Sequence, residues 1–113
     1  MKSKEGPLAT AALHILLALS ESDLHGYGIM QSVKRQSEGE YKLGPGTLYA
    51  NLAGLLENGL VGEKQRRMEN GETRREYCLT ADGKRVLRVE IRRLTQIVAS
   101  ARQRLGKLDQ KDA

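Results

Sequence analysis

The sequence has few aromatic residues and almost no cysteine: among its 113 residues there is no Trp, no Phe and one Cys. Without Trp or Phe, a hydrophobic core must be built mainly from Leu, Ile, Val and Ala. A chain of this length has room for one compact core and at most a projecting element. A single cysteine excludes an intrachain disulfide, so we expect the protein to work in the reducing cytoplasm.

The sequence also lacks a hydrophobic run long enough to cross a bilayer, which requires about 20 apolar residues. The longest run, residues 8–19, superficially resembles a signal peptide because lysines precede it. However, Pro7, Thr10 and His14 interrupt this region, and no small-residue cleavage pattern follows cleanly. The sequence therefore predicts a buried first helix and no membrane partner.

The chain is basic, with a net charge of +5. Residues 1–60 hold 5 Lys and Arg against 6 Asp and Glu, whereas residues 61–113 hold 14 against 8. The excess positive charge therefore lies in the second half. A polyanion such as nucleic acid is a partner that suits this distribution.

Hydrophobic spacing predicts three short helices in the first half. The first begins at Pro7, the second spans residues 24–37 with Ser20 or Asp23 as candidate caps, and the third begins at Pro45. Asn58-Gly59 ends the third helix through a left-handed cap.

A hairpin and a long helix are expected next. Residues 69–72 give a strong turn signal between two short strands. Thr80 is expected to cap a last helix from residue 82 to about residue 106, with a frayed tail from about residue 109. The fold class is therefore mainly α with a small β-hairpin. It corresponds to a winged helix-turn-helix over residues 1–80 and a long C-terminal dimerisation helix over residues 81–113.

The last helix has an apolar repeat with alternating spacings of four and three residues, which is the pattern of a coiled coil. Such a helix would be roughly 37 Å long, more than a chain of this size can cover, so a second copy is the simplest partner. The alternative is that the stripe folds back on the first helix of the same chain. Glu90 is expected to be the lone acid on the otherwise basic, solvated faces. The stripe consists of Leu87, Ile91, Leu94, Val98, Ala101, Leu105 and Leu108.

Five basic residues flank the predicted turn of the hairpin. A hairpin brings them close together, and the phosphates of a DNA backbone would supply the counter-charge that they need. The alternative is a solvated wing balanced by Glu69 and Glu72. The basic residues are Lys64, Arg66, Arg67, Arg74 and Arg75.

The third helix carries the polar residues of a possible major-groove face. Lys42 precedes it, and Gly46 leaves its N-terminal amides open to a phosphate. Thr47 and Asn51 could meet a thymine methyl group and an adenine edge. Tyr49 is a further exposed polar candidate.

Four motifs in order resemble the PadR family of bacterial transcriptional regulators. They are HGYGIM at residues 25–30, GPGTLY at 44–49, LLENGLV at 55–61 and REYCLTADG at 75–83. The resemblance extends from Leu8 to about Leu105. Within the family, the chain looks like the short-form members with a single C-terminal dimerisation helix.

The resemblance implies a homodimeric repressor that binds a palindromic operator and is often released by a small molecule. It also implies that Tyr27 and Tyr49 contact the DNA backbone, and that Thr47 faces DNA at the start of the recognition helix. Arg74 or Arg75 would reach the minor groove or its phosphates. One departure is Gly44, where the family more often has Ser, which removes a side-chain cap.

Other functions are less well supported by the sequence. Neither a catalytic pattern nor a phosphate-binding loop is present, so we expect no enzyme and no cofactor. His14, His25 and Cys78 lack the spacing of a metal site, and Cys78 is more typical of a packing residue than of a redox sensor. A winged-helix module that binds a protein rather than specific DNA remains the alternative function.

The sequence leaves the effector open. The long helix carries none of the four tyrosines, although a ligand would be expected between the paired helices and the winged domains. Either the effector is not a flat aromatic molecule, or it binds weakly, or none exists.

Overall fold

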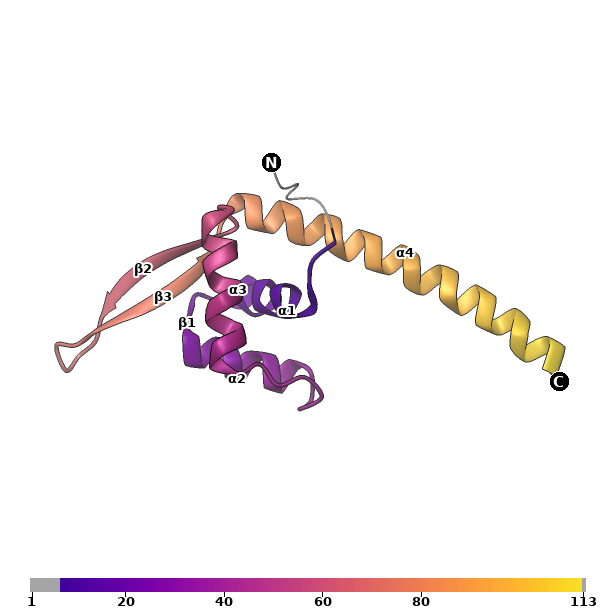
Figure 1. Cartoon of the computed structure of the whole chain (residues 1–113), viewed down its shortest axis with the longest axis horizontal. Coiled ribbons are helices and arrows are strands. Elements are labelled where there is room, and N and C mark those ends of the chain that lie inside the picture. The colour runs from indigo at the N-terminus through magenta and orange to yellow at the C-terminus, as the bar shows by residue number, and fades with distance from the viewer. Residues whose placement is uncertain (1–6, 113) are drawn as a thin grey trace.

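The structure, a computed structural model, describes residues 7–112. Three short helices form the body, a hairpin projects from one side, and a long helix leaves on the other (Figure 1). The predicted fold class, mainly α with a small β element, is confirmed. The elements in chain order are α1 (Thr10–Glu21), β1 (Leu24–His25), α2 (Gly26–Gln36), α3 (Pro45–Glu57), β2 (Val61–Arg67), β3 (Thr73–Leu79) and α4 (Ala81–Asp112).

The core lies between α1, α2, α3 and the start of α4. Its fully buried large side chains are aliphatic, as the composition requires: Ile15, Leu16, Ile29, Leu48, Leu52, Val33 and Val86. Tyr77 is the only aromatic side chain among the buried hydrophobic residues that the structure describes. A core of this kind holds the three helices rigidly enough to position polar side chains on their outer faces.

The first helix begins later than the sequence predicted. α1 starts at Thr10 after an extended Ala9, so Pro7 is not its first residue. The backbone N–H of Leu8 instead donates a hydrogen bond of 3.0 Å to Glu90 in α4. This long-range contact ties the segment before α1 to α4, and local spacing could not have shown it.

The sheet has three strands rather than two, in the antiparallel order β1-β3-β2. Leu24 and His25, predicted to open the second helix, form β1 and pair with Tyr77 and Glu76 of β3. The helix therefore begins at Gly26, and no side chain caps it. The prediction of Ser20 or Asp23 as its cap is wrong.

The third helix and the hairpin follow the sequence prediction. Gly44 is the N-cap residue of α3, Pro45 occupies its first turn, and Gly59 adopts a φ of 74° just after its end. In the hairpin turn, Met68 N–H donates to Glu72 O at 2.7 Å. Gly71 takes the left-handed conformation with a φ of 87°.

The last helix begins as predicted but ends later. Thr80 Oγ1 accepts a hydrogen bond of 2.9 Å from Gly83 N–H, which confirms Thr80 as its cap. α4 then runs for 32 residues to Asp112, so the expected frayed tail from residue 109 is helical. At 1.5 Å per residue its length is about 48 Å. It accounts for most of the 65 Å long axis of the molecule (Figure 1).

Glu90 does not lie on a solvated face of α4. Its side chain is buried and accepts two hydrogen bonds from the Arg93 guanidinium, at 2.7 and 2.8 Å. These bonds, together with the one from Leu8, lower the pKa of the Glu90 carboxyl, against the opposing effect of burial. Glu90 therefore anchors the N-terminal segment and α1 to α4.

No helix in the described part of the chain combines the length and the apolar character that a membrane span requires.

Candidate nucleic-acid interface

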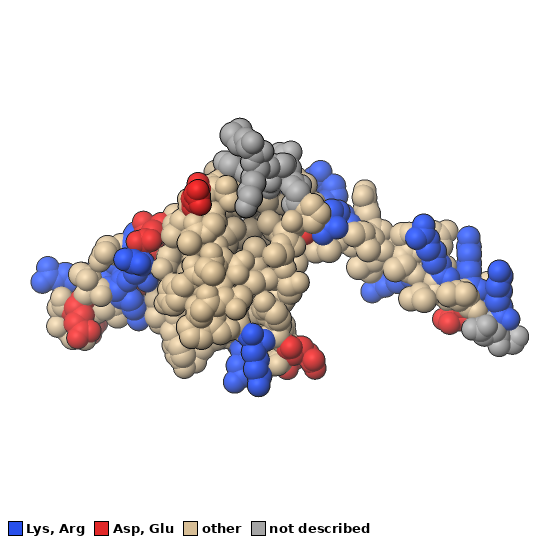
Figure 2. Space-filling view, viewed as in Figure 1, with Lys and Arg blue, Asp and Glu red and all other residues tan. Residues whose placement is uncertain are grey.

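Basic side chains gather at the two ends of the molecule. Figure 2 shows Lys and Arg over the hairpin and along the projecting part of α4, while the face of the body between them is mostly uncharged. The hairpin, β2 and β3 with their turn, is called the wing below. Its basic residues are Lys64, Arg66, Arg67, Arg74 and Arg75.

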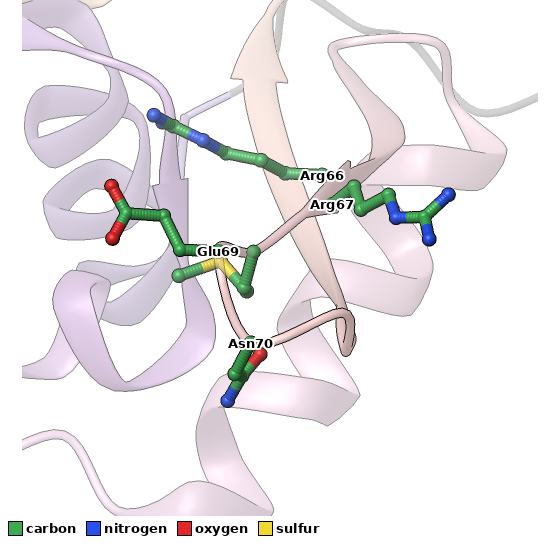
Figure 3. Close-up of a pocket in the computed structure, with 5 residues that line it drawn as sticks. Arg66, Arg67, Glu69 and Asn70 are labelled. Atoms are coloured by element: carbon green, nitrogen blue, oxygen red, sulfur yellow. The ribbon is translucent and has the colours of Figure 1, made fainter.

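The strand register divides these residues between two faces. Lys64 pairs with Glu76 and Arg66 with Arg74, and side chains directly opposite one another project on the same face. Arg75 lies opposite Gln65 on the other face, which Arg67 shares. Figure 3 shows the Arg66 and Arg67 side chains leaving the hairpin on opposite sides. The wing therefore presents positive charge to both sides rather than on one surface.

Acidic residues of the protein pair with most of these cations. Lys64 lies 2.5 Å from Asp23 and Arg75 lies 3.0 Å from Glu63. Glu76 is 3.5 Å from Arg66 and 3.6 Å from Arg74. The sequence analysis considered the turn residues Glu69 and Glu72 as the acids that balance the wing, but the ion-pair partners are other residues. Arg67 has no ion pair with a described residue.

A groove lies between the wing and the body, and it brings two predicted DNA contacts together. Tyr49 projects from α3 across the start of α2, where its hydroxyl lies so close to Gly26 that any larger residue would displace it. Arg75 lines the same groove from β3. The groove has a volume of about 440 Å³ and is lined by Gly26, Tyr49, Gln65, Thr73, Arg75 and Tyr77.

Sequence reasoning did not select Gln65 or Thr73 for this groove. They become visible only once the register is known, since both share the face of Arg75 and Tyr77. The alternation of residues along each strand was the available signal, but it required the pairing partner of each residue.

The exposed surface of α3 begins at its open N-terminus. Gly46 and Thr47 are exposed, Tyr49 is half exposed, and Lys42 is exposed just before the helix. The Asn51 side-chain amide donates a hydrogen bond of 2.8 Å to Thr47 O. Asn51 is therefore turned back onto its own helix, with one of its two amide N–H donors engaged.

Tyr27 stands on the exposed side of α2, with its hydroxyl accepting a hydrogen bond of 2.8 Å from Gln31. His25, two residues earlier, is part of the sheet. Burial and the nearby Arg74 lower the pKa of His25, while Glu76 acts in the opposite direction. A neutral imidazole therefore lies beside Glu76 at neutral pH.

The other residues considered for chemistry have structural surroundings. The His14 ring stacks on Tyr41 with centroids 4.6 Å apart. Cys78 is partly buried on β3 opposite Gly62. Within residues 7–112 no three His, Cys, Asp or Glu side chains gather in a way that could hold a metal ion.

The apolar stripe of α4 is exposed over most of its length. Leu87 is only 8% exposed and belongs to the core of its own chain. It is therefore not available to a partner, contrary to the prediction from the heptad pattern. From Ile91 onward the stripe reaches solvent, and Ile97, which the heptad pattern omits, widens it. Only the first part of α4 packs on α1. The exposed or partly exposed residues of the stripe, called the α4 seam below, are Ile91, Leu94, Ile97, Val98, Ala101, Leu105 and Leu108.

Comparisons with known proteins agree with this architecture. Transcriptional regulator Rv3488 of Mycobacterium tuberculosis is 34% identical over 103 residues, which cover 91% of this chain and 90% of that protein. A crystal structure of a PadR family transcription regulator from Clostridium difficile has a TM-score of 0.74 at 24% identity, covering 86% of this chain and 99% of that one.

A second solved structure, Bacillus subtilis PadR in complex with operator DNA, shares the fold with a TM-score of 0.63 at 22% identity. The matched region covers 71% of this chain and 45% of the Bacillus subtilis PadR chain. The Mycobacterium tuberculosis and Clostridium difficile proteins are described as regulators of transcription, the class that the sequence predicted for this chain. The transcriptional regulator PadR-like family matches residues 15–89. The chain therefore belongs to the PadR-like family of transcriptional regulators.

Proposed function

We propose that the protein is a homodimeric repressor that binds a palindromic operator. The observation that supports DNA binding best is the groove in which Tyr49 of α3 and Arg75 of the wing face the same space. A hydroxyl and a guanidinium are both donors to phosphate oxygens. With α3 in the major groove and the wing at the adjacent minor groove, the DNA backbone that separates these two grooves would place its phosphates beside Tyr49 and Arg75.

In this arrangement α3 enters the major groove through its open N-terminus. Gly46 and Thr47 would lie closest to the DNA, with Lys42 and Tyr27 beside the backbone. On the wing, phosphates would replace exposed acids as partners of Lys64 and Arg75. Exposed ion pairs are worth about 0–1 kcal/mol, so little is lost in this exchange.

Pairing through the α4 seam is the second part of the proposal. The seam is too apolar to remain in water along a helix about 48 Å long, and a second copy offers the same surface. Residues up to 80 would then form the DNA-binding unit and α4 the pairing helix. Two copies would place their α3 helices in successive major grooves about 34 Å apart. Bound near a promoter, the dimer would block access by RNA polymerase in the cytoplasm.

Release by a small molecule is the third part. A shallow groove of about 350 Å³ lies at the border of the seam and includes the seam residues Ile97 and Ala101; its other lining residues are Arg93, Gln96, Ser100 and Arg104. It is open on one side, so a second copy could complete it as a ligand site. A ligand bound there would act directly on the pairing geometry.

A gel-shift titration on DNA from upstream of the protein's own gene tests the proposal, at two salt concentrations and with competitor DNA. We expect a discrete shift that survives excess competitor and weakens steeply with salt, because Lys and Arg contacts release counterions. If no duplex binds, whether the upstream DNA or duplexes selected from random sequence, the protein is a winged-helix module for a protein partner instead.

A further inference from the structure

Glu76 differs from every other acid in the wing because it is buried. The residue is 4% exposed although it lies on β3 among basic side chains. Its neighbours in the register are His25 on one side and Lys64 on the other, so it occupies the middle of the three-stranded sheet. A buried carboxylate is costly unless it is paired, so its partners determine what it does.

The partners of Glu76 are two arginines that lie directly opposite each other. Arg66 and Arg74 are cross-strand neighbours, with Cβ atoms about 5 Å apart, where like charges repel. One oxygen of Glu76, Oε2, lies 3.5 Å from Arg66 and 3.6 Å from Arg74 and offsets this repulsion. Lys64, although it faces Glu76 in the register, is bonded to Asp23. Arg66 and Arg74 are therefore the ion-pair partners of the Glu76 carboxylate.

The guanidinium groups of Arg66 and Arg74 contact Glu76 and still have N–H groups that can donate to another acceptor. At 3.5 and 3.6 Å the contacts are ion pairs rather than short hydrogen bonds, so N–H groups remain for another acceptor. The Nε of Arg74 is buried and has no hydrogen-bond partner among the described residues. The Arg74 side chain nevertheless remains 37% exposed. Arg66 is 65% exposed.

The other two acids that pair with the wing are of a different kind. Glu63 and Asp23 are 35% and 42% exposed and contact Arg75 and Lys64 at shorter distances. Phosphates can replace such exposed partners. They cannot easily replace Glu76, whose side chain is only 5% exposed.

We propose that Glu76 is a positioning residue of the DNA interface. It holds Arg66 and Arg74 side by side so that both can donate to the same stretch of DNA backbone. The proposal rests on the proposed function, since it requires that the wing binds DNA. It reverses the usual expectation for an acid in a basic DNA-binding surface, because Glu76 favours binding instead of opposing it.

The test compares Glu76→Gln with Glu63→Gln, which makes the same change on the adjacent strand. The probe is a labelled duplex of about 30 base pairs from upstream of the gene, long enough for two half-sites one turn apart. Removing either negative charge should tighten binding if charge alone matters. We expect Glu63→Gln to tighten it by about threefold. Glu76→Gln should weaken it by about fivefold and reduce its salt dependence.

Two further variants show whether Glu76 acts through the arginines. In an Arg66→Ala/Arg74→Ala background, Glu76→Gln should no longer weaken binding. Glu76→Asp, which keeps the charge, should bind more tightly than Glu76→Gln, and it serves as the test if the Gln variant fails to fold. Thermal unfolding of each variant checks that it is folded at the assay temperature.

Tighter or unchanged binding by Glu76→Gln would overturn the proposal while leaving DNA binding intact. So would a weakening that persists without the two arginines. If the unmodified protein binds no duplex, the proposed function and this inference fail together.

Discussion

Replacing Val98 and Leu105 with Glu should convert the proposed dimer into monomers. Both side chains lie on the α4 seam beyond the part of the helix that packs on the body, and they are 46% and 57% exposed in the single chain. Neither contributes to the core, so the winged domain should remain folded. Carboxylates at these positions would instead be buried against a second copy without partners, which is costly.

The expected loss can be worked out from these exposures. Complete burial of a Val or Leu side chain is worth about 1.5–3 kcal/mol, and roughly half of each side chain is still exposed. Each would therefore contribute about 1 kcal/mol on pairing, and four such side chains in a dimer about 4 kcal/mol. This corresponds to a weakening of the dimer by about a thousandfold, before any repulsion between the carboxylates.

Sedimentation equilibrium over a range of concentrations measures this effect directly. The matched control is Gln103→Glu/Gln110→Glu, which places the same charges seven residues apart on the opposite side of α4 and should leave the dimer intact. Unchanged circular dichroism would confirm that the variants are folded. If the Val98→Glu/Leu105→Glu protein still sediments as a dimer with unchanged affinity, the seam is not the pairing surface.

Three further predictions follow from individual contacts. Gly26→Ala should weaken DNA binding by about fivefold, as measured by anisotropy, because a Cβ there displaces the Tyr49 hydroxyl; an unchanged affinity would remove Tyr49 from the interface. Glu90→Gln should lower the Tm at neutral pH, where the carboxylate bonded to Arg93 is ionised. Because the pKa of Glu90 is depressed in the folded protein, its stabilisation is present above its ordinary pKa of about 4.5 and is lost as the pH falls through the folded value. The difference in Tm between the two proteins should therefore shrink in acid, and a constant difference would contradict the pairing. Gly106→Ala should raise the stability of α4 by about 1 kcal/mol, seen as increased helical circular dichroism on heating, since the new Cβ meets no other atom; no gain would mean that this part of α4 is not helical in solution.

The features that the sequence predicted well have local signals. Pro45 and Gly59 mark the two ends of α3, Gly71 marks the hairpin turn, and Thr80 caps α4, as the structure confirms. Each of these residues acts on backbone within a few positions of itself. Their effect is therefore visible without knowledge of the tertiary structure.

The features that were missed depend on partners far away in the chain. Leu24 and His25 form a strand only because β3, about fifty residues later, offers a free edge. Glu90 has the sequence context of a surface acid, but it is buried and accepts a hydrogen bond from the segment before α1. Leu87 continues the heptad repeat but packs in its own core. Periodicity shows which residues are apolar, not which neighbour covers them.

The same limit applies to the candidate site. Counting basic residues located the wing, but the number of charges said nothing about their arrangement. The strand register separates Arg66 and Arg74 from Arg67 and Arg75, and it places the buried Glu76 beneath the first pair. Pairing between strands is set by the whole sheet. The sequence alone therefore shows which residues are charged, but not on which face of the hairpin each of them lies.

The uninterrupted course of α4 has a mechanical consequence. From its cap at Thr80, next to the last strand of the wing, the helix continues without a break to Asp112. In the proposed dimer it would act as a stiff lever with its fulcrum at the crossing of the two helices. If the helices cross near Val98, the start of α4 lies about 26 Å from the crossing at 1.5 Å per residue, and a rotation of about 5° moves it by roughly 2 Å. A displacement of about 2 Å stretches a hydrogen bond beyond its working length, so a slight change in the crossing angle would be enough to take one DNA-binding domain out of register with the other.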